Sequence, residues 1–456
     1  MVMKILLASL ALLFLAPGFA PQRGARTVRP NVLFIVADDL RANYGDPIAH
    51  TPNLNRLAAR AVTFRRAYAQ YPVCNPSRVS FLTGLRPETT GILGNNTFFR
   101  EKLPDVVTLP QLLRGNGYFT ASLGKIFHRG LTMEDKRADW ADEKSFAHVG
   151  IYDATAIGGR GEGRRLAGDE APWCRWLAAE GTDEDQADGQ IAAEAVRLIE
   201  QKRDAPWFIG AGFHKPHDPF VAPKKYFDLY PLEKIPLTAD PAGRSPEIES
   251  AIPKAYGNFA KFTDRERREF KRAYLAGVSF MDAQVGKLLD ALDRNGLWER
   301  TIVVFLGDHG YHLGERGWWN KNTLFEWSAR APLLIAAPGM KTGAAADGLA
   351  ELLDLYPTLV DLIGVQAPHR LEGRSLRPLL RDPRARGKEA AFTIVMRGRI
   401  RGRTVRTDRW RYTEWDAGAA GVELYDHRRD PGEFRNLAGD AAYANEARSL
   451  KAMLKE

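Results

Sequence analysis

The sequence predicts an α/β fold in which helices flank a mostly parallel central sheet, followed by a small antiparallel sheet in a C-terminal subdomain. Short apolar runs alternate with amphipathic segments along most of the 456 residues, as is typical of parallel sheets. The clearest amphipathic segment leads directly into an apolar run, as in a βαβ unit. From about residue 378 this alternation gives way to arginine-rich stretches broken by Gly and Pro. Because 45% of the residues are hydrophobic, the chain can bury a large core.

Five short apolar runs are the predicted core strands. Polar groups follow four of them, and their lengths suit buried strands better than helices. The runs are Asn31 to Val36, Tyr118 to Leu123, Trp207 to Gly212, Thr301 to Leu306, and Leu333 to Ala336.

The clearest predicted helix covers about residues 271–294. Tyr274, Val278 and Met281 fall close to a 3.6-residue period, and Gly296 supplies a stop signal. A core strand follows at once, which gives the helix-to-strand half of a βαβ unit.

Residues 378–456 are predicted to form the C-terminal subdomain, and residues 21–377 the main domain. Short β-prone pieces in the C-terminal part indicate an antiparallel sheet, at Phe392 to Met396, Arg409 to Glu414, and Val422 to Tyr425. The segment from Thr132 to Asp188 is rich in Gly, Asp and Glu, and we interpret it as a surface insertion.

The N-terminus predicts a signal peptide over residues 1–20. Lys4 precedes an apolar run from Ile5 to Leu15, and Gly18-Phe19-Ala20 has the small residues that signal peptidase reads. An uncleaved anchor is the alternative, but the run is shorter than the roughly 20 residues that span a bilayer. We therefore expect an exported protein, periplasmic or secreted, that spans no membrane after cleavage.

Two cysteines, Cys74 and Cys174, are too few for a disulfide scaffold in an exported protein of this size. A single disulfide between them is one interpretation. The residues around Cys74 favour a chemical role for it instead.

Polar side chains follow four of the predicted strands, at the edge of an open α/β sheet where ligands bind. Asp38 and Asp39 follow the first strand, and Asp308 and His309 follow the fourth. Such a set suits a hard cation such as Ca²⁺ or Mg²⁺, with imidazole as an unusual extra ligand. An Asp pair alone would more often cap a helix or lie solvated in a loop.

Cationic groups follow the other two strands. Lys125 and His128 come after the second strand, and His214, Lys215 and His217 after the third. Next to a metal pocket, these groups would neutralise a bound tetrahedral oxyanion. Each taken singly would more often be a surface residue.

The most specific motif is Cys74-Asn75-Pro76-Ser77-Arg78. Pro76 suits the first turn of a helix, so Cys74 would lie at a helix N-terminus, where anions are favoured. Arg78 would reach the same anion with a planar fork. A soft thiolate fits a calcium pocket poorly, whereas an oxidised side chain, an aldehyde hydrate with two hydroxyls, would fit it well.

Cys74 to Arg78 resemble the signature of the sulfatase family, Cys-x-Pro-Ser-Arg, in which formylglycine-generating enzyme converts the cysteine to formylglycine. Leu82-Thr83-Gly84 continues the signature. Further matches along most of the chain are Asp38-Asp39, Gly124-Lys125, His214-Lys215-Pro216-His217, Gly307-Asp308-His309-Gly310, Lys321 and Glu423 to Asp426. Gly124 to His128 and Phe213 to His217 look most like the iduronate-2-sulfatase branch. The resemblance implies the alkaline-phosphatase-like form of the α/β fold.

The resemblance also implies roles for individual residues. The metal, usually calcium with Mg²⁺ or Mn²⁺ possible, would be held by Asp38, Asp39, modified Cys74, Asp308 and His309. Many relatives have Asn at the position of His309, which leaves the identity of the ion open. Contacts to formylglycine or sulfate would come from Arg78, Lys125, His128, His217 and Lys321. Trp318 could stack on a sugar ring, although such aromatics more often pack beside a pocket.

The implied activity is hydrolysis of a sulfate ester, on a sulfated small molecule, sugar or glycan, with release of inorganic sulfate. We expect a hydroxyl of the formylglycine hydrate to attack sulfur, with His217 or Lys321 protonating the leaving alcohol and His128 accepting a later proton. Two alternatives are a phosphonate or phosphate ester hydrolase on the same scaffold and a non-catalytic protein that binds sulfated glycans.

The net charge of +9 favours anionic partners. The excess lies partly in residues 374–386 and 397–411, which contain no nucleic-acid motif, so no nucleic-acid partner is expected. A solvated basic face is one interpretation, and a contact surface for a sulfated polyanion is the other.

Overall fold

The computed structural model of the protein describes residues 29–44, 46–128, 142–166, 171, 173–201, 206–254 and 259–454. The predicted signal peptide, residues 1–20, lies outside these ranges. Within them, no helix is both long enough and apolar enough to cross a membrane.

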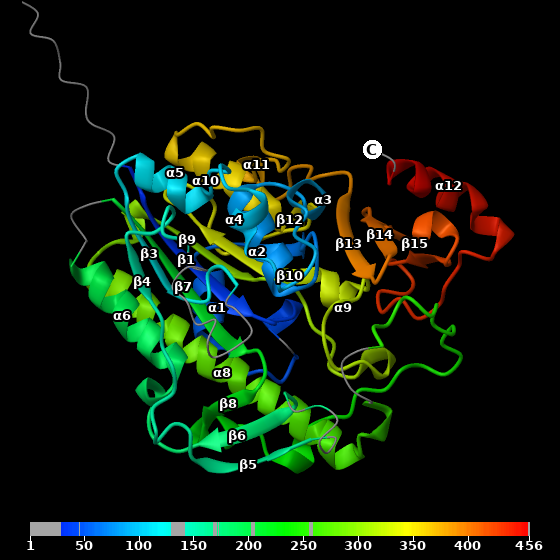
Figure 1. Ribbon diagram of the computed structural model, residues 1–456, viewed down its shortest axis with the longest axis horizontal. Coiled ribbons are helices and arrows are strands. Elements are labelled where there is room, and N and C mark those ends of the chain that lie inside the picture. Colours follow the sequence, from blue (N-terminus) through cyan, green and yellow to red (C-terminus); the bar gives the residue numbers. More distant parts are fainter. Residues whose placement is uncertain are drawn as a thin grey trace, which may run out of the picture.

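A nine-stranded sheet runs through the middle of the molecule (Figure 1). All five predicted core strands belong to it, with ends that differ from the predicted ones by at most four residues. In spatial order the strands are β11 (Ala344–Ala346), β2 (Val62–Tyr68), β10 (Arg330–Ala336), β9 (Thr301–Gly307), β1 (Asn31–Asp38), β7 (Trp207–Pro216), β3 (Phe119–Gly124) and β4 (His148–Gly150), and β12 (Ala350–Glu351) also pairs with β2.

Most of the strand pairs are parallel, as predicted. β1 pairs in parallel with β7 and β9, and β3 pairs in parallel with β7 and β4. β10 is the exception, because it runs antiparallel to both β9 and β2. The mostly parallel α/β fold is therefore confirmed.

Side chains of the central strand β1 alternate between two hydrophobic layers. Leu33 and Ile35 belong to one layer, and Phe34 and Val36 to the other, because successive side chains of a strand point to opposite faces. Both layers are fully buried. The continuous apolar run that predicted this strand is thus explained by burial on both faces.

Helices cover both faces of the sheet (Figure 1). The Leu33 side is covered by α1 (Pro52–Ala58), α6 (Ala187–Gln201) and α8 (Asp264–Arg294). The Phe34 side is covered by α2 (Cys74–Thr83), α5 (Leu109–Gly115), α10 (Leu355–Ile363) and α11 (Arg377–Arg381). Short helices in the connections are α3 (Pro87–Thr90), α4 (Phe99–Lys102), α7 (Lys224–Phe227) and α9 (Glu326–Ala329).

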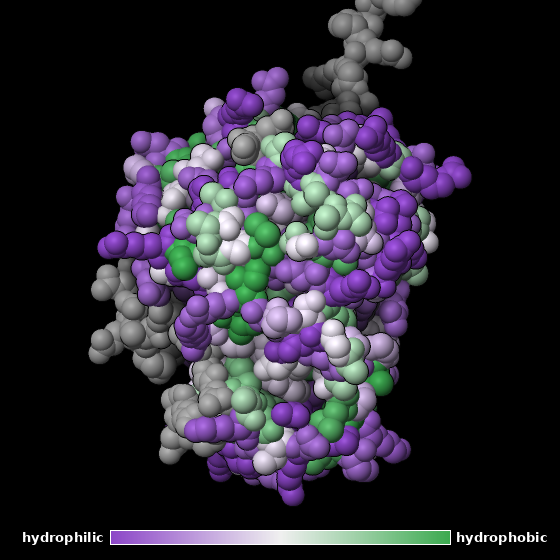
Figure 2. Space-filling model, turned by 90° about the vertical axis from the view of Figure 1, so that its right-hand side faces the viewer, coloured by the Kyte–Doolittle hydropathy of each residue, from purple (hydrophilic) through white to green (hydrophobic). Residues whose placement is uncertain are grey.

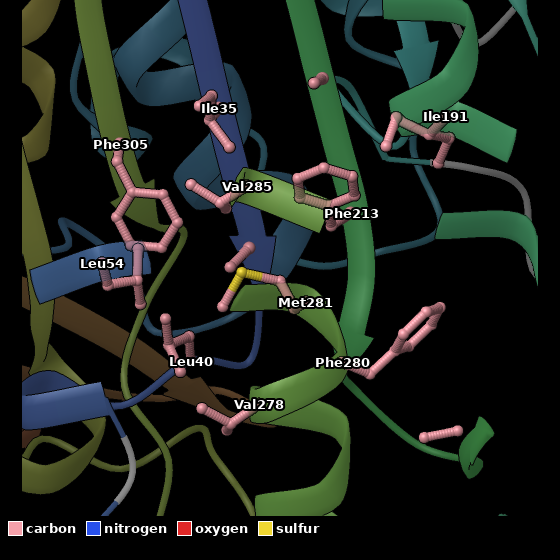
Figure 3. Close-up of a cluster of buried hydrophobic side chains, with 14 of the residues drawn as sticks. Ile35, Leu40, Leu54, Ile191, Phe213, Val278, Phe280, Met281, Val285 and Phe305 are labelled. Carbon is pink, nitrogen blue, oxygen red and sulfur yellow. The ribbon is translucent and has the colours of Figure 1, made fainter. Parts of the chain in front are cut away.

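Helix α8 is the predicted amphipathic helix, and it begins seven residues before the expected start. Thr263 and Glu266 form a capping box that fixes this start, since each side chain bonds the other's backbone N–H. Figure 3 shows Val285 of this helix next to Ile35 of β1, with Met281, earlier in the helix, in the same hydrophobic cluster. The helix therefore braces the centre of the sheet.

The C-terminal part forms the predicted antiparallel sheet. Its order is β13 (Ala391–Arg397), β14 (Ile400–Arg406), β15 (Trp410–Trp415) and β16 (Val422–Asp426). Helix α12 (Ala444–Met453) packs on it through Leu450, which lies in one cluster with Val405 and Leu424. Strand β14 is absent from the prediction because Arg401, Arg403 and Arg406 mask its alternating pattern.

The interpretation of residues 132–188 as a surface insertion is wrong for part of that segment; residues 132–141 lie outside the described ranges. Strand β4 extends the main sheet, and β5 (Gly161–Arg165) and β6 (Arg175–Ala179) form a second sheet with β8 (Phe220–Pro223). Trp176 and Cys174 pack in the main core. Cys74 and Cys174 are both buried and free, so no disulfide joins them.

Candidate active site

Four neighbouring parallel strands end in the polar groups that the sequence singles out. The order β9, β1, β7, β3 places their carboxyl ends side by side. The groups at these ends are Asp308 and His309, then Asp38 and Asp39, then His214 to His217, and then Lys125 and His128. Strands far apart in the sequence therefore deliver one continuous cluster.

Asp38, Asp39, Asp308 and His309 form an acidic cluster in which each residue is at most 1% exposed. The backbone N–H of Asp39 donates to Asp308 Oδ1 at 3.2 Å. His309 Nε2 lies 3.5 Å from Asp39 Oδ1 and 3.7 Å from Asp308 Oδ1. His309 Nδ1 lies 2.9 Å from the carbonyl of Gly310, so donation there would leave the Nε2 lone pair facing the carboxylates.

The backbone of Asp39 is held in place by Tyr274, which the sequence identifies only as an apolar position of the predicted helix. Asp39 has φ of 63°, an unusual value for a residue other than glycine. The Tyr274 hydroxyl of α8 donates to the Asp39 carbonyl at 2.7 Å and accepts from the Arg41 N–H at 3.0 Å. Tyr274 therefore fixes the turn that points Asp39 into the cluster.

Cys74 lies at the start of α2 and is completely buried. Its Sγ is 3.0 Å from Lys321 Nζ, 3.5 Å from His309 Nε2 and 4.0 Å from Asp39 Oδ1. Burial raises the pKa of the thiol, and the negative charge of Asp38 raises it further. The unmodified cysteine is therefore neutral and a poor nucleophile.

Arg78 joins three of the strand ends. Its Nε donates to Asp308 Oδ2 at 2.9 Å, and Nη2 lies 3.3 Å from Asp38 Oδ1. Its Nη1 donates to the Lys125 carbonyl. Arg78 is fully buried and holds two carboxylates of the cluster in place, while its contact with an anion stays a prediction.

Two lysines supply further positive charge. Lys125 Nζ contacts Asp38 Oδ2, and Lys321 Nζ lies 2.5 Å from Asp39 Oδ1. Both lysines are 6% exposed. The structure therefore brings the predicted cations from two distant segments to the acidic cluster, and Lys321 also contacts Cys74.

Three histidines lie at the ends of β7 and β3: His214 among the last residues of β7, His217 just after it, and His128 after β3. His217 Nδ1 lies 2.6 Å from the carbonyl of Asp218, and Nε2 lies 3.7 Å from Asp39 Oδ2. His128 is buried, and burial together with Lys125 holds its pKa well below the ordinary value. His214 turns away to Asp188, 3.0 Å from its Oδ1.

Asp188 is a further positioning residue that sequence analysis does not find. It lies in the first turn of α6 and accepts from the backbone N–H groups of His214 at 2.8 Å and Lys215 at 2.9 Å. These bonds fix the backbone just before His217. No local motif marks it, because its partners are 26 and 27 residues away.

Trp318 is 4% exposed and packs edge-on against Phe259, with ring centroids 5.2 Å apart. Its Nε1–H donates to the Lys321 carbonyl at 2.9 Å. The geometry supports packing and placement of Lys321 rather than stacking on a sugar, because neither ring face is presented to solvent.

The carboxylates of the cluster differ in charge state. Burial would raise the pKa of Asp38, but Lys125, His217 and Arg78 outweigh it and hold the pKa well below the ordinary value. Burial raises the pKa of Asp39 to about 6 despite Lys321, and the charges of Asp38 and Asp308 contribute. Three acids in one buried cluster repel one another, so the arrangement suits a divalent cation.

Comparison with known proteins matches residues 30–365 to the sulfatase family model. The chain belongs to the sulfatase family. Residues 314–456 match a second model, the C-terminal part of N-sulphoglucosamine sulphohydrolase. This sulfatase is a sulfuric ester hydrolase, as the resemblance implied.

Two of the relatives of this sulfatase match 77% or more of its length. A sulfatase from Formosa agariphila is 35% identical over 93% of this chain and 86% of its own. Iduronate 2-sulfatase from Mus musculus is 35% identical over 77% of this chain and 72% of its own. The solved phosphonate monoester hydrolase of Agrobacterium radiobacter shares the fold, with a TM-score of 0.78 and 22% identity over 94% of this chain and 95% of its own.

Proposed function

We propose that this sulfatase hydrolyses sulfate esters of a sulfated sugar or glycan, with formylglycine derived from Cys74 as the reactive group. The observation that carries the proposal is the position of Cys74, in contact with both Lys321 and His309. The side chain thus lies between the acidic cluster and the cations. A sulfate bound there would meet positive charge, while the reactive group would meet a metal.

The acidic cluster fits a divalent cation. Asp38, Asp39, Asp308 and His309 would hold it together with formylglycine, and Ca²⁺ is the proposed ion because oxygen donors dominate the set. Asp39 Oδ2 is buried and accepts no hydrogen bond from the described residues. With the cation bound, a formylglycine hydrate would supply a metal-activated hydroxyl for attack on sulfur and a second hydroxyl for the release of sulfate.

The other side chains would bind the sulfate, neutralise its charge and protonate the leaving alcohol. Arg78, Lys125 and Lys321 surround Cys74 with positive charge that would stabilise the sulfate oxygens. His217 Nε2 faces the cluster and would carry the proton to the leaving alcohol, or Lys321 would do so. His128 would accept the proton of the second hydroxyl.

A sugar substrate is supported by the iduronate 2-sulfatase relative and by the loop next to Cys74. Within residues 91–100, Asn95 Oδ1 accepts from the Asn75 N–H at 3.0 Å, and the Gly94 and Thr97 carbonyls accept from the Asn75 side chain at 2.9 Å. This loop would therefore border the part of the substrate beyond the sulfate.

Replacement of Cys74 is the direct test. Cys74→Ala should fold and be exported but release no sulfate from an aryl sulfate, whereas Cys174→Ala, a matched buried cysteine, should keep turnover. Mass spectrometry of the Cys74 peptide from the native host should show the mass of formylglycine. Normal turnover by Cys74→Ala, or an unmodified thiol in fully active protein, would refute the mechanism.

Metal removal tests the acidic cluster. Chelation should abolish turnover, and Ca²⁺, Mg²⁺ and Mn²⁺ added back separately should rank the ions, with Ca²⁺ restoring the most activity. Asp39→Asn should weaken the response to added ion at least about tenfold, because it removes one charged ligand. Full activity in the presence of excess chelator would exclude a required exchangeable metal.

Phosphonate or phosphate ester hydrolysis is the second candidate. The phosphonate monoester hydrolase shares the fold, and sulfate and phosphate esters differ mainly in charge. Parallel assays with aryl sulfate, aryl phosphate and a phosphonate monoester rank the activities. Faster turnover of either phosphorus ester would replace the sulfate proposal, and glycan binding without any turnover by modified protein would favour the non-catalytic alternative.

Export and domain division are part of the proposal. Residues 1–20 would be removed as a signal peptide, residues 21–377 would form the catalytic domain, and residues 378–456 the C-terminal subdomain. N-terminal sequencing of the exported protein should begin at residue 21.

A further inference from the structure

Positive charge is concentrated in one segment outside the active site. Residues 370–411 contain fourteen lysines and arginines but only four acids. The net positive charge of this segment is therefore larger than the net charge of +9 of the whole chain. Such a concentration attracts polyanions and speeds their association.

Two adjoining cavities collect part of this charge. One, of about 850 Å³, lies between residues 345–349 of the main domain and residues 383–389. The other, of about 560 Å³, lies between Arg86 and the same segment. Both are lined by residues 386–389 and by Met453 of α12, so they share a wall. We call the two cavities together the basic groove.

The basic groove is cationic on balance. Its lining contains eight lysines and arginines against five acids. None of the proposed catalytic or metal-binding residues lines it. Figure 2 turns the side of the molecule that carries β13–β15 and α12 towards the viewer, and hydrophilic residues cover much of that face.

Some cations of the basic groove are held by buried acids, whereas others extend into solvent. Lys388 is fixed, because its Nζ lies 2.6 Å from Asp354 Oδ1 and also contacts Glu351, and both acids are buried. Arg384 and Arg386 are outward, with side chains 93% and 82% exposed. The first kind holds the floor of the groove in place, and the second can turn to a ligand.

The outward arginines can exchange their partners. Arg386 pairs with Glu389 at 2.8 Å and Arg428 with Asp408 at 3.2 Å, but all four side chains are more than 60% exposed. Exposed pairs of this kind contribute little to stability, so a sulfate group can replace the carboxylates at low cost. The planar guanidinium offers two parallel N–H donors that match sulfate oxygens.

We propose that the basic groove binds a linear sulfated polysaccharide and so gives the proposed glycan substrate a second contact outside the active site, a role that rests on the proposed function. A chain with an anion on each repeat matches several outward cations better than a single anion does, and each added contact raises the effective concentration of the next. Among the described residues that line the groove, Phe392 is the only aromatic one, so this lining lacks the series of stacking platforms that single-stranded nucleic acids require.

The test uses the full-length protein and heparin as the probe. Arg384→Ala/Arg386→Ala/Arg428→Ala should raise the dissociation constant for heparin about tenfold at physiological salt, the combined effect of three exposed charge contacts. The matched control is Arg160→Ala/Lys224→Ala/Arg294→Ala, which removes three exposed cations outside the groove. The control should bind heparin within about twofold of the unaltered protein.

Turnover separates this proposal from the active-site proposal. The groove variant should hydrolyse a small aryl sulfate at the unaltered rate, while KM for a sulfated polysaccharide rises and kcat stays constant. Equal loss of heparin binding in groove and control variants would overturn the groove, even if aryl sulfate is hydrolysed. Equal affinity for duplex DNA would overturn the assignment to a sulfated glycan, and absence of aryl sulfate turnover would count against the active site alone.

Discussion

At the residue scale, Tyr274 fixes the backbone that carries Asp39 into the acidic cluster. Its hydroxyl joins the Asp39 carbonyl and the Arg41 N–H, so one oxygen fixes both sides of a turn with positive φ. The residues of the site could be predicted because they occur in short sequence motifs, either at strand ends or, for Cys74 and Arg78, at the start of α2. Tyr274 and Asp188 could not, since each acts through the backbone of a segment distant in the sequence.

Removal of the Tyr274 hydroxyl should therefore impair activity without altering the charged groups. We expect Tyr274→Phe to lower kcat/KM for an aryl sulfate about tenfold and the free energy of unfolding by about 1–3 kcal/mol, because two buried backbone groups lose their partner. Steady-state kinetics and urea denaturation measure the two effects.

Tyr356→Phe is the matched control for this substitution. Tyr356 is equally buried, and its hydroxyl donates to the Val107 carbonyl at 3.1 Å, away from the site. It should lose stability but keep kcat/KM. An equal loss of activity in both variants would show that Tyr274 acts only through global stability.

At the scale of elements, the strands and helices that could be predicted from the sequence are those with a long buried face. The five core strands are apolar because helices cover both faces of the sheet, and α8 is periodic because one face packs on Ile35 and Phe213. Strand β2 was not predicted, because its centre, Thr63 to Arg66, includes two arginines. Short edge strands such as β4 carry too few residues to show a pattern.

The approach of β7 to β3 sets the position of Lys125. A Cβ on Gly212 would lie 2.1 Å from the Lys125 carbonyl oxygen, so any side chain there would push the two strand ends apart. We expect Gly212→Ala to lower the free energy of unfolding by about 1–3 kcal/mol and to reduce sulfate turnover, since Lys125 and its contact with Arg78 would shift. Urea denaturation and aryl sulfate assays measure these effects.

Gly210→Ala on the same strand is the comparison. A Cβ there would lie 2.9 Å from the Ile126 side chain and 3.3 Å from the Ala121 carbonyl oxygen, so its contact with backbone is much less severe than at Gly212. Its effect on turnover should be clearly smaller. If Gly210→Ala reduced turnover more than Gly212→Ala, the close approach of the strands at Gly212 would not determine the position of Lys125.

At the scale of the whole molecule, buried ion pairs join α9, which leads directly into β10 of the main sheet, to the C-terminal sheet. Arg411 of β15 lies 2.6 Å from Glu326 of α9 and also contacts Glu433, which follows β16. Glu433 in turn accepts from the Glu326 N–H at 2.8 Å. The acids and His427 resemble a metal site in composition, but Arg411 already supplies the positive charge between the two carboxylates.

These pairs make the stability of the molecule depend on pH. Burial opposes ionisation of Glu433, but Arg411 and His427 outweigh it and lower its pKa from 4.5 to about 2. A depressed folded-state pKa contributes stability that is complete above the unfolded pKa and is lost as pH falls through the folded one. The contribution of Glu433 should therefore be complete above about pH 4.5 and disappear towards pH 2.

Glu433→Gln should lower the free energy of unfolding at neutral pH by about 3 kcal/mol, because Arg411 loses a buried partner. It should also flatten the decline in stability between pH 4.5 and about 2, the interval in which Glu433 takes up its proton. Urea denaturation at several pH values measures both effects, and the exposed Glu299→Gln serves as the control. If the free energy of unfolding falls with the same slope in the variant and the control over this interval, the Arg411 ion pairs do not determine the loss of stability in acid. A shallower slope in Glu433→Gln alone would assign that loss to the Arg411 ion pairs.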